Sequence, residues 1–238
     1  MPNTRIVLVC PLRRELHEIR SYIGGEWVVE KKEGFTLYRN STWEKTYSWY
    51  LYSALIGTDI KSIKQKIKNI IQYYSPDIII ELGYAGGLDP ELMPGTMVIS
   101  DTAYSHTAAQ MINLCKCAAL SEKVSDNKVC LHASVLCTSA IINDDHQRRR
   151  LFEKYHTGIV TGETYTLAEQ CMKNNIQCYS IRIITDSYGS DINHMHAAEF
   201  AELFINGISG LKDIINILAN EIKVCKEANN NYGNKELL

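Results

Sequence analysis

The chain has 238 residues, of which 45% are hydrophobic and 22% are charged. This length suits one large domain or two small ones, and either is long enough to bury a substantial core. The 25 Lys and Arg residues nearly balance the 27 Asp and Glu residues, which leaves a formal net charge of -2. No segment is basic enough to form a nucleic-acid footprint, so a dedicated DNA- or RNA-binding protein is not expected.

The N-terminal sequence predicts neither a signal peptide nor a membrane span. Its apolar run, residues 6–12, ends at Arg13 and is shorter than either would require. We therefore expect a cytoplasmic protein. Most of the eight cysteines lie in apolar segments, which indicates buried free thiols rather than a disulfide framework. Their spacing lacks the paired C-x2-C of structural zinc sites, so no metal or other cofactor is expected.

Strand-like and helix-like stretches alternate from the start of the chain. Residues 5–10 form a short apolar, β-branched run, and residues 12–23 carry apolar side chains at helical spacing. Residues 49–55 predict another strand, and an apolar stripe over residues 60–74, with lysines opposite, predicts a helix. Residues 78–80 are three isoleucines, typical of a central strand that is buried on both faces.

The second half continues the alternation less regularly. Residues 83–87 form a glycine-rich loop where a ligand can approach the backbone, and residues 102–128 have only a weak pattern. Further strands are expected at residues 96–100, 135–137, 158–160 and 177–184, and helices at residues 143–155, 164–172 and 196–225. The pattern predicts one α/β domain over residues 1–227, a three-layer sandwich with a twisted mixed central sheet, and a disordered tail at residues 228–238.

Three acidic residues follow predicted strands. Glu15 lies one turn into the first helix, Glu163 follows the strand ending at residue 160, and Asp186 follows the strand ending at residue 184. Ligands of open α/β sheets bind beyond the carboxyl ends of the strands, so these side chains could converge. Three carboxylates that converge on one crevice would suit cleavage of a glycosidic bond, in which one acid protonates the leaving group and another carboxylate activates water. Taken singly, each acid is more typical of a helix cap or a surface charge.

The segment GYAGGLDPELMPGTMVISD, residues 83–101, resembles the G-x-A-G-G-L-x-P-x-L-x-x-G-D-x-V signature of the nucleoside phosphorylase and nucleosidase superfamily. Three further motifs, IVLVCPLRREL before this segment and VTGETYTLAE and IRIITD after it, occur in the same order as in this family. The similarity runs from about Arg5 to the C-terminal helix. It is nearest in pattern to the methylthioadenosine/S-adenosylhomocysteine nucleosidases and the hopanoid-associated nucleosidases.

The resemblance implies a role for each acid. Glu15 would position or activate the attacking water, Glu163 would bind the ribose 2′ and 3′ hydroxyls, and Asp186 would protonate or hold N7 of a departing purine. The backbone of Ala85 and Gly86 would line the sugar or the base. These roles suit the chemistry, because the ribose gains oxocarbenium character as the C–N bond stretches and a carboxylate on its hydroxyls stabilises that charge.

Three positions depart from the family pattern. Tyr84 stands in the glycine loop, and Gly162 replaces the methionine that usually precedes the glutamate. Residues 140–142 offer only aliphatic side chains where many nucleosidases stack an aromatic ring on the purine. We still expect Tyr84, Gly162 and Ile142 to contact the substrate. Family members are often oligomers, so a homo-oligomer is also expected.

The nucleophile could be water or phosphate. Superfamily phosphorylases bind phosphate through an arginine in the first loop, another on the central strand, and a Ser or Thr in the glycine loop. Arg13 resembles the first of these, but Glu81 and Tyr84 occupy the other positions. Hydrolysis of a purine nucleoside or a 5′-substituted adenosine is therefore favoured. A phosphate-dependent phosphorylase and a catalytically weak nucleoside-binding protein remain alternatives.

Two further groups of side chains have plainer explanations. The spacing of His194 and His196 could suit a metal, but two ligands alone do not make a site. The adjacent arginines Arg148, Arg149 and Arg150 are more typical of a solvated helix face than of an anion site.

Overall fold

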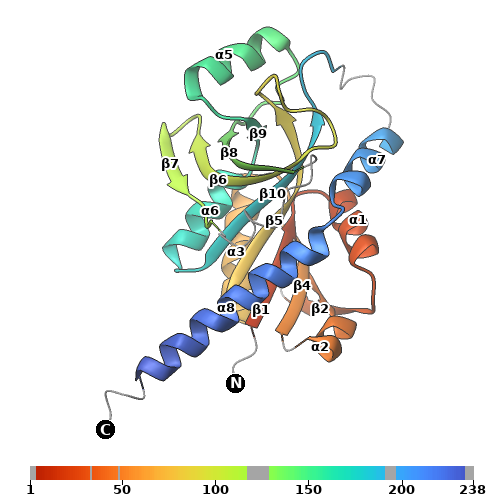
Figure 1. The fold of residues 1–238 in the computed structure, drawn as a ribbon, viewed down its shortest axis with the longest axis vertical. Coiled ribbons are helices and arrows are strands. Elements are labelled where there is room, and N and C mark those ends of the chain that lie inside the picture. Colours follow the sequence, from red (N-terminus) through yellow and green to blue (C-terminus); the bar gives the residue numbers. More distant parts are fainter. Residues whose placement is uncertain (1–3, 33, 48, 117–128, 191–196, 234–238) are drawn as a thin grey trace.

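The computed structural model describes residues 4–32, 34–47, 49–116, 129–190 and 197–233 (Figure 1). A mixed sheet lies between two layers of helices. The strands are β1 (Thr4–Cys10), β2 (Trp27–Lys32), β3 (Phe35–Asn40), β4 (Trp49–Leu55), β5 (Ile78–Gly87), β6 (Met97–Ser105), β7 (Gln110–Asn113), β8 (Val129–Cys137), β9 (Ile159–Thr161) and β10 (Gln177–Asp186). The helices are α1 (Arg13–Ile23), α2 (Ser41–Thr46), α3 (Ile60–Tyr74), α5 (Asp145–Tyr155), α6 (Thr164–Lys173), α7 (Ala197–Gly207) and α8 (Leu211–Gly233).

The sheet is open at one end and closed at the other. Its strand order is β10-β6-β8-β9-β5-β1-β4-β3-β2, with β7 paired to β6. Strand β10 also pairs with β5 in parallel, while it runs antiparallel to β6. Strands β5, β9, β8, β6 and β10 therefore close into a ring, from which β1, β4, β3 and β2 extend as an open sheet. This arrangement confirms the predicted α/β fold with a twisted mixed sheet.

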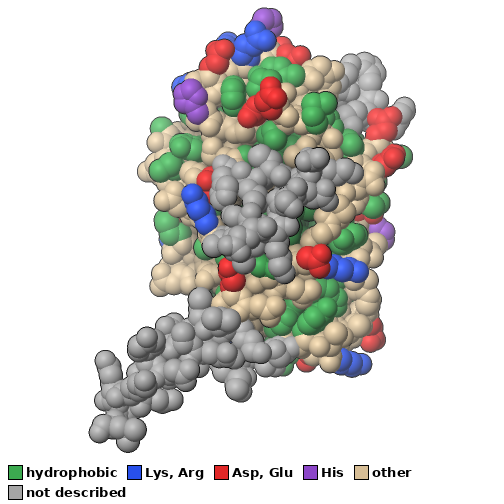
Figure 2. Space-filling model, viewed as in Figure 1, with side chains coloured by type: hydrophobic (Ala, Val, Ile, Leu, Met, Phe, Trp, Pro, Cys, Tyr) green, Lys and Arg blue, Asp and Glu red, His purple; other side chains and the backbone are tan. Residues whose placement is uncertain are grey.

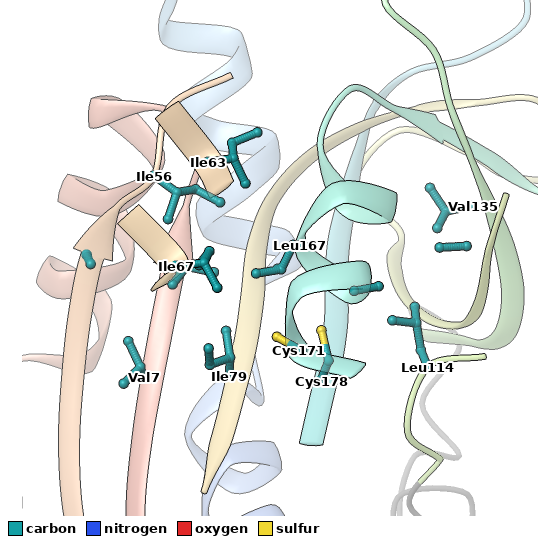
Figure 3. Close-up of a cluster of buried hydrophobic side chains, with 14 of the residues drawn as sticks. Val7, Ile56, Ile63, Ile67, Ile79, Leu114, Val135, Leu167, Cys171 and Cys178 are labelled. Carbon is teal, nitrogen blue, oxygen red and sulfur yellow. The ribbon is translucent and has the colours of Figure 1, made fainter. Parts of the chain in front are cut away.

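Alternation along the strands builds the layers. Ile6 and Leu8 of β1 pack in the same cluster as the apolar faces of α1, α7 and α8, whereas Val7 and Val9 pack with α3 and α6. Successive side chains of a strand point to opposite faces, so one apolar run supplies both clusters. Figure 3 shows part of the second cluster, where Ile67 of α3 and Leu167 of α6 lie over the sheet.

Helix α3 forms where the sequence predicts it. The Asp59 carboxylate accepts hydrogen bonds from the backbone N–H groups of Lys61 and Ser62, at 3.0 and 3.1 Å, and so caps the first turn. Ile63 and Ile67 are fully buried, while the lysines turn to solvent. On the face seen in Figure 2, acidic and basic side chains are interspersed, in keeping with the net charge of -2.

The C-terminal part differs from the prediction. The single helix expected over residues 196–225 is divided into α7 and α8. Gly207 ends α7 against the sheet, since a Cβ there would lie 2.6 Å from Cγ2 of Ile183, and Gly210 has a φ of +90°. Helix α8 continues to Gly233, past Ala228, where the sequence predicts the start of a tail. No helix in the described ranges is long and apolar enough to cross a membrane.

Other differences concern the strands. Strands β2 and β3 and helix α2 are absent from the sequence prediction. The glycine-rich segment at residues 83–87 is not a loop, because it continues β5 and pairs with β10 and β9. Strand β6 extends to Ser105 and pairs with β7 in the region that has only a weak sequence pattern. Cys117, His194 and His196 lie outside the described residues.

Candidate functional site

A cavity of about 780 Å³ opens where β5, β9 and β10 end. It brings together most of the residues that the sequence singles out: Tyr84, Ala85, Gly86, Ile142, Gly162, Glu163 and Asp186. Its lining continues past Glu163 to Thr58 and Lys64, at the start of α3. The C-terminal residues of all five ring strands line this cavity, although β9 runs antiparallel to β5.

Glu15 lies next to this site without lining the cavity. It is 1% exposed on α1 and accepts hydrogen bonds from the backbone N–H groups of Leu12, at 2.7 Å, and Tyr84, at 2.8 Å. Burial raises the pKa of the Glu15 carboxyl to about 8, against the lowering effect of the Arg182 charge and of both hydrogen bonds. A carboxyl group with this pKa is mostly protonated at neutral pH.

Gly83 allows Glu15 to approach the sheet. A Cβ at this position would lie 2.7 Å from Oε1 of Glu15 and 2.6 Å from Nη1 of Arg182. Both atoms belong to buried side chains, so a larger residue would have to displace them. The absence of a side chain at Gly83 is what places Glu15 and Arg182 side by side against β5.

Arg182 connects the acidic residues of the site. Its guanidinium is fully buried and lies 2.5 Å from Oε1 of Glu81 and 2.8 Å from Oε1 of Glu163. The same group donates to the hydroxyl of Thr164 at 3.0 Å and to the carbonyl oxygen of Tyr84 at 3.3 Å. Arginine stays protonated in proteins, so it supplies a fixed positive charge at the junction of β5, β10 and α6.

The charges of this cluster do not balance when every group is ionised. Arg182 can neutralise one negative charge, whereas Glu15, Glu81 and Glu163 are all buried around it. Burial and the charge of Glu81 raise the pKa of Glu163, although Arg182 opposes both effects. The cluster is therefore able to hold a proton, or to take one up, close to the sugar-binding position that the resemblance implies for Glu163.

Asp186 is not part of the Arg182 cluster and is held instead by Arg148 and Thr185. Its Oδ2 accepts a hydrogen bond from Nη2 of Arg148, and its Oδ1 accepts one from the hydroxyl of Thr185 at 2.9 Å. Arg148 corrects an expectation, because it is fully buried while Arg149 and Arg150 are exposed. It also donates to the carbonyl oxygen of Gly87 at 2.8 Å. The three arginines thus do not form one solvated face.

The remaining candidates differ in how they face the cavity. The ring of Tyr84 packs against Phe204 and Phe200 of α7, at centroid distances of 5.0 and 5.9 Å. Ile142 is buried, and its neighbour Ile141 is 80% exposed at the cavity. Arg13 is exposed and lies outside the lining.

Arg182 is absent from the residues that the sequence singles out, and Arg148 is among them only as part of an exposed helix face. Arg182 stands within the apolar strand sequence QCYSIRIITD, just as Glu81 stands within IIIEL. Opposite charges inside two strands buried on both faces could have indicated a buried pair. Nothing in the local sequence distinguishes Arg148 from the two arginines that follow it.

The chain is similar in sequence to known proteins. Residues 5–216 match the family model of the Phosphorylase superfamily. A 5′-methylthioadenosine/S-adenosylhomocysteine nucleosidase of Buchnera aphidicola subsp. Baizongia pistaciae (strain Bp) is 28% identical over 167 residues, which are 62% of this chain and 64% of the relative's length.

Solved structures share the fold. The native futalosine hydrolase of Helicobacter pylori strain 26695 superposes with a TM-score of 0.78 at 15% identity, over 90% of this chain and 97% of that one. The 5′-methylthioadenosine/S-adenosyl homocysteine nucleosidase of Helicobacter pylori superposes with a TM-score of 0.76 at 15% identity, over 91% and 99% of the two chains. The match of the family model to most of the chain shows that the protein belongs to the Phosphorylase superfamily.

Proposed function

We propose that the protein hydrolyses the N-glycosidic bond of a purine nucleoside or a 5′-substituted adenosine and releases the base. The observation that carries this proposal is the placement of Glu163 and Asp186 on one cavity, with Glu15 buried beside it. The nucleosidases among the similar proteins support the reaction type. We also propose that the protein forms a homo-oligomer. A measurement of its molecular mass in solution tests this.

In the proposed reaction, each acid acts on a different part of the substrate. Glu163 binds the ribose hydroxyls and stabilises positive charge on the ring as the C1′–N9 bond breaks. The bonding electrons go to N9, a proton from solvent reaches N7 as the bond breaks, and the purine leaves as a neutral base whose N7–H donates a hydrogen bond to Asp186. A water molecule attacks C1′ and gives up a proton to Glu15, which must be ionised to accept it.

The charges near the cavity favour water over phosphate as the nucleophile. Lys64 is the only Lys or Arg among the described residues that line the cavity, and it is engaged with Glu169 at 3.7 Å. The central strand contributes Glu81, which would repel an anion, and the guanidinium of Arg182 is already occupied by carboxylates. A phosphate ion would need donors that are free to bind it.

The test is to incubate the protein with adenosine, inosine and 5′-methylthioadenosine, with and without phosphate, and to identify the products by mass spectrometry. Hydrolysis gives free base and free sugar, at a rate independent of phosphate. Base release that requires phosphate and yields a sugar 1-phosphate would establish a phosphorylase instead. Binding of nucleosides without any release of base would support the nucleoside-binding alternative.

A further inference from the structure

Tyr84 belongs to the cavity wall and is in direct contact with Glu15. Tyr84 lines the cavity, whereas Glu15 is 1% exposed and does not line it. The backbone N–H of Tyr84 donates to Oε1 of Glu15 at 2.8 Å. In the proposed reaction, the attacking molecule must reach both C1′ in the cavity and the carboxylate of Glu15. The side chain that separates the two therefore determines which nucleophile can react.

The ring of Tyr84 lies between α7 and α1. On the side of α7 it packs edge-on against Phe204, at a centroid distance of 5.0 Å, and tilted against Phe200, at 5.9 Å. Burial raises the pKa of the Tyr84 phenol to about 12, and the charges of three residues of α1 also act on it: Arg14, Glu15 and Glu18. The phenol is therefore close to the helix that carries Glu15.

Packing holds this ring in place without a hydrogen bond. The hydroxyl of Tyr84 is buried and has no hydrogen-bond partner among the residues that the structure describes. A shift of the ring is thus opposed by its apolar contacts, and the cost of such a shift rises with the size of the group that has to be accommodated. A ring held in this way discriminates between small molecules by their volume.

The protonation of Glu15 agrees with a closed wall. Burial is the largest influence on its pKa of about 8, and it outweighs the charge of Arg182 and the two backbone hydrogen bonds. Solvent that reached Glu15 from the cavity would hydrate the carboxylate and weaken the effect of burial. The carboxyl group is dry although it lies next to a residue of the cavity wall.

We propose that the ring of Tyr84 closes the cavity off from Glu15 and limits the nucleophile to a molecule of the size of water. This inference rests on the proposed function, in which Glu15 accepts a proton from the nucleophile. The charges near the cavity act against anions, whereas a limit by size also excludes uncharged alcohols. Methanol that passed the ring would attack C1′, give its hydroxyl proton to Glu15 and form a methyl glycoside as the base leaves.

Base release in water that contains methanol tests this limit. The substrate is the nucleoside that the protein hydrolyses best, and mass spectrometry measures the ratio of methyl glycoside to free sugar. We expect almost no methyl glycoside from the wild type, and a ratio at least tenfold higher from Tyr84→Ala. Tyr84→Phe keeps the ring and should exclude methanol as the wild type does. Ile141→Ala widens the cavity at a position that is 80% exposed and should leave the ratio unchanged.

A second measurement follows the barrier without catalysis. The pH dependence of unfolding, with and without Glu15→Gln, gives the pKa of Glu15 in each background. In Tyr84→Ala, water reaches the carboxyl group, so this pKa should fall from about 8 to about 7 or below. The charges of Arg182 and Glu163 act on Glu15 in both backgrounds. A purely structural effect of Tyr84→Ala would lower stability at every pH and leave the pKa of Glu15 in place.

Two results with methanol overturn the proposal. One is an unchanged product ratio in folded Tyr84→Ala, and the other is a wild type that forms methyl glycoside in proportion to the methanol supplied. If circular dichroism shows that Tyr84→Ala is unfolded, Tyr84→Leu replaces it with the same expectations. A wild type that releases no base from any nucleoside refutes the proposed hydrolysis. The pKa of Glu15 then tests the barrier alone, and a value that Tyr84→Ala does not change overturns it.

Discussion

Replacement of Glu15 by glutamine should change how the stability of the protein depends on pH. Glu15 is almost fully buried and has a pKa of about 8 in place of its ordinary 4.5, so the folded state retains a proton that the unfolded state loses between these values. Stability rises with pH where the unfolded state binds more protons, and here the folded state binds more. The contribution of Glu15 is therefore fully present below about pH 4.5 and is lost as the pH rises through 8.

The size of the effect follows from the two pKa values. At about 1.4 kcal/mol per pH unit, ionising buried Glu15 costs up to about 5 kcal/mol, and relaxation of its neighbours reduces this to about 3 to 5 kcal/mol. Glutamine has nearly the same shape and does not titrate. We therefore expect Glu15→Gln to gain about 3 to 5 kcal/mol in unfolding free energy relative to the wild type between about pH 5 and about pH 9.

Urea denaturation at several pH values measures this difference. Glu18→Gln provides the matched control, since Glu18 lies on the same helix and is only half-buried. The reasoning fails if the wild type and Glu15→Gln lose stability in parallel as the pH rises. The ionisation of Glu15 should also set the pH dependence of catalysis, because in the proposed reaction Glu15 must be ionised to accept a proton from water. We expect kcat/KM of the wild type to rise as the pH approaches 8 and Glu15→Gln to lose base release at every pH.

Three further variants test other parts of the site. Asp186→Asn should slow base release at least about 100-fold while nucleoside binding persists, and chromatography of the released base with calorimetry of binding separates the two effects. Arg182→Met leaves Glu81 and Glu163 buried without their counter-charge and should destabilise the protein by about 3–5 kcal/mol in urea; a loss below about 1 kcal/mol would contradict the buried network. Gly83→Ala forces a Cβ against Glu15 and Arg182 and should cost about 1–3 kcal/mol, whereas an unchanged urea midpoint would show that the site has spare room.

Much of the fold could be predicted from the sequence because its signals are local. Strand β1 and helices α1 and α3 have apolar residues at the spacing that their burial requires, and the structure places them where expected. The hairpin of β2 and β3 escaped prediction for a physical reason. Strand β2 is at the edge of the sheet, and its side chains are exposed or half-buried, so no run of buried residues marks it.

The site could be predicted only in part. Glu163 and Asp186 are recognisable because each follows a strand. Their convergence depends on the ring, in which β10 pairs with β5 in parallel and β9 pairs with β5 antiparallel. The contacts of Arg182 with Glu81 and of Arg148 with Asp186 join residues far apart in the chain. They arise from tertiary packing, which local periodicity does not encode. The roles of the acids stay predictions until the variants are measured.

The closed ring of strands determines when the cavity can form during synthesis of the chain. Strand β10 completes the ring by pairing with both β5 and β6, and it is the last strand along the chain. It also carries Arg182 and Asp186, so a nascent chain whose residues 177–186 are still inside the ribosome lacks both the closure of the ring and the acid that we propose to bind the base. Because domains generally fold as units during synthesis, the cavity is assembled late in translation. A fragment that ends before Gln177 should bind no purine, however well its first strands fold.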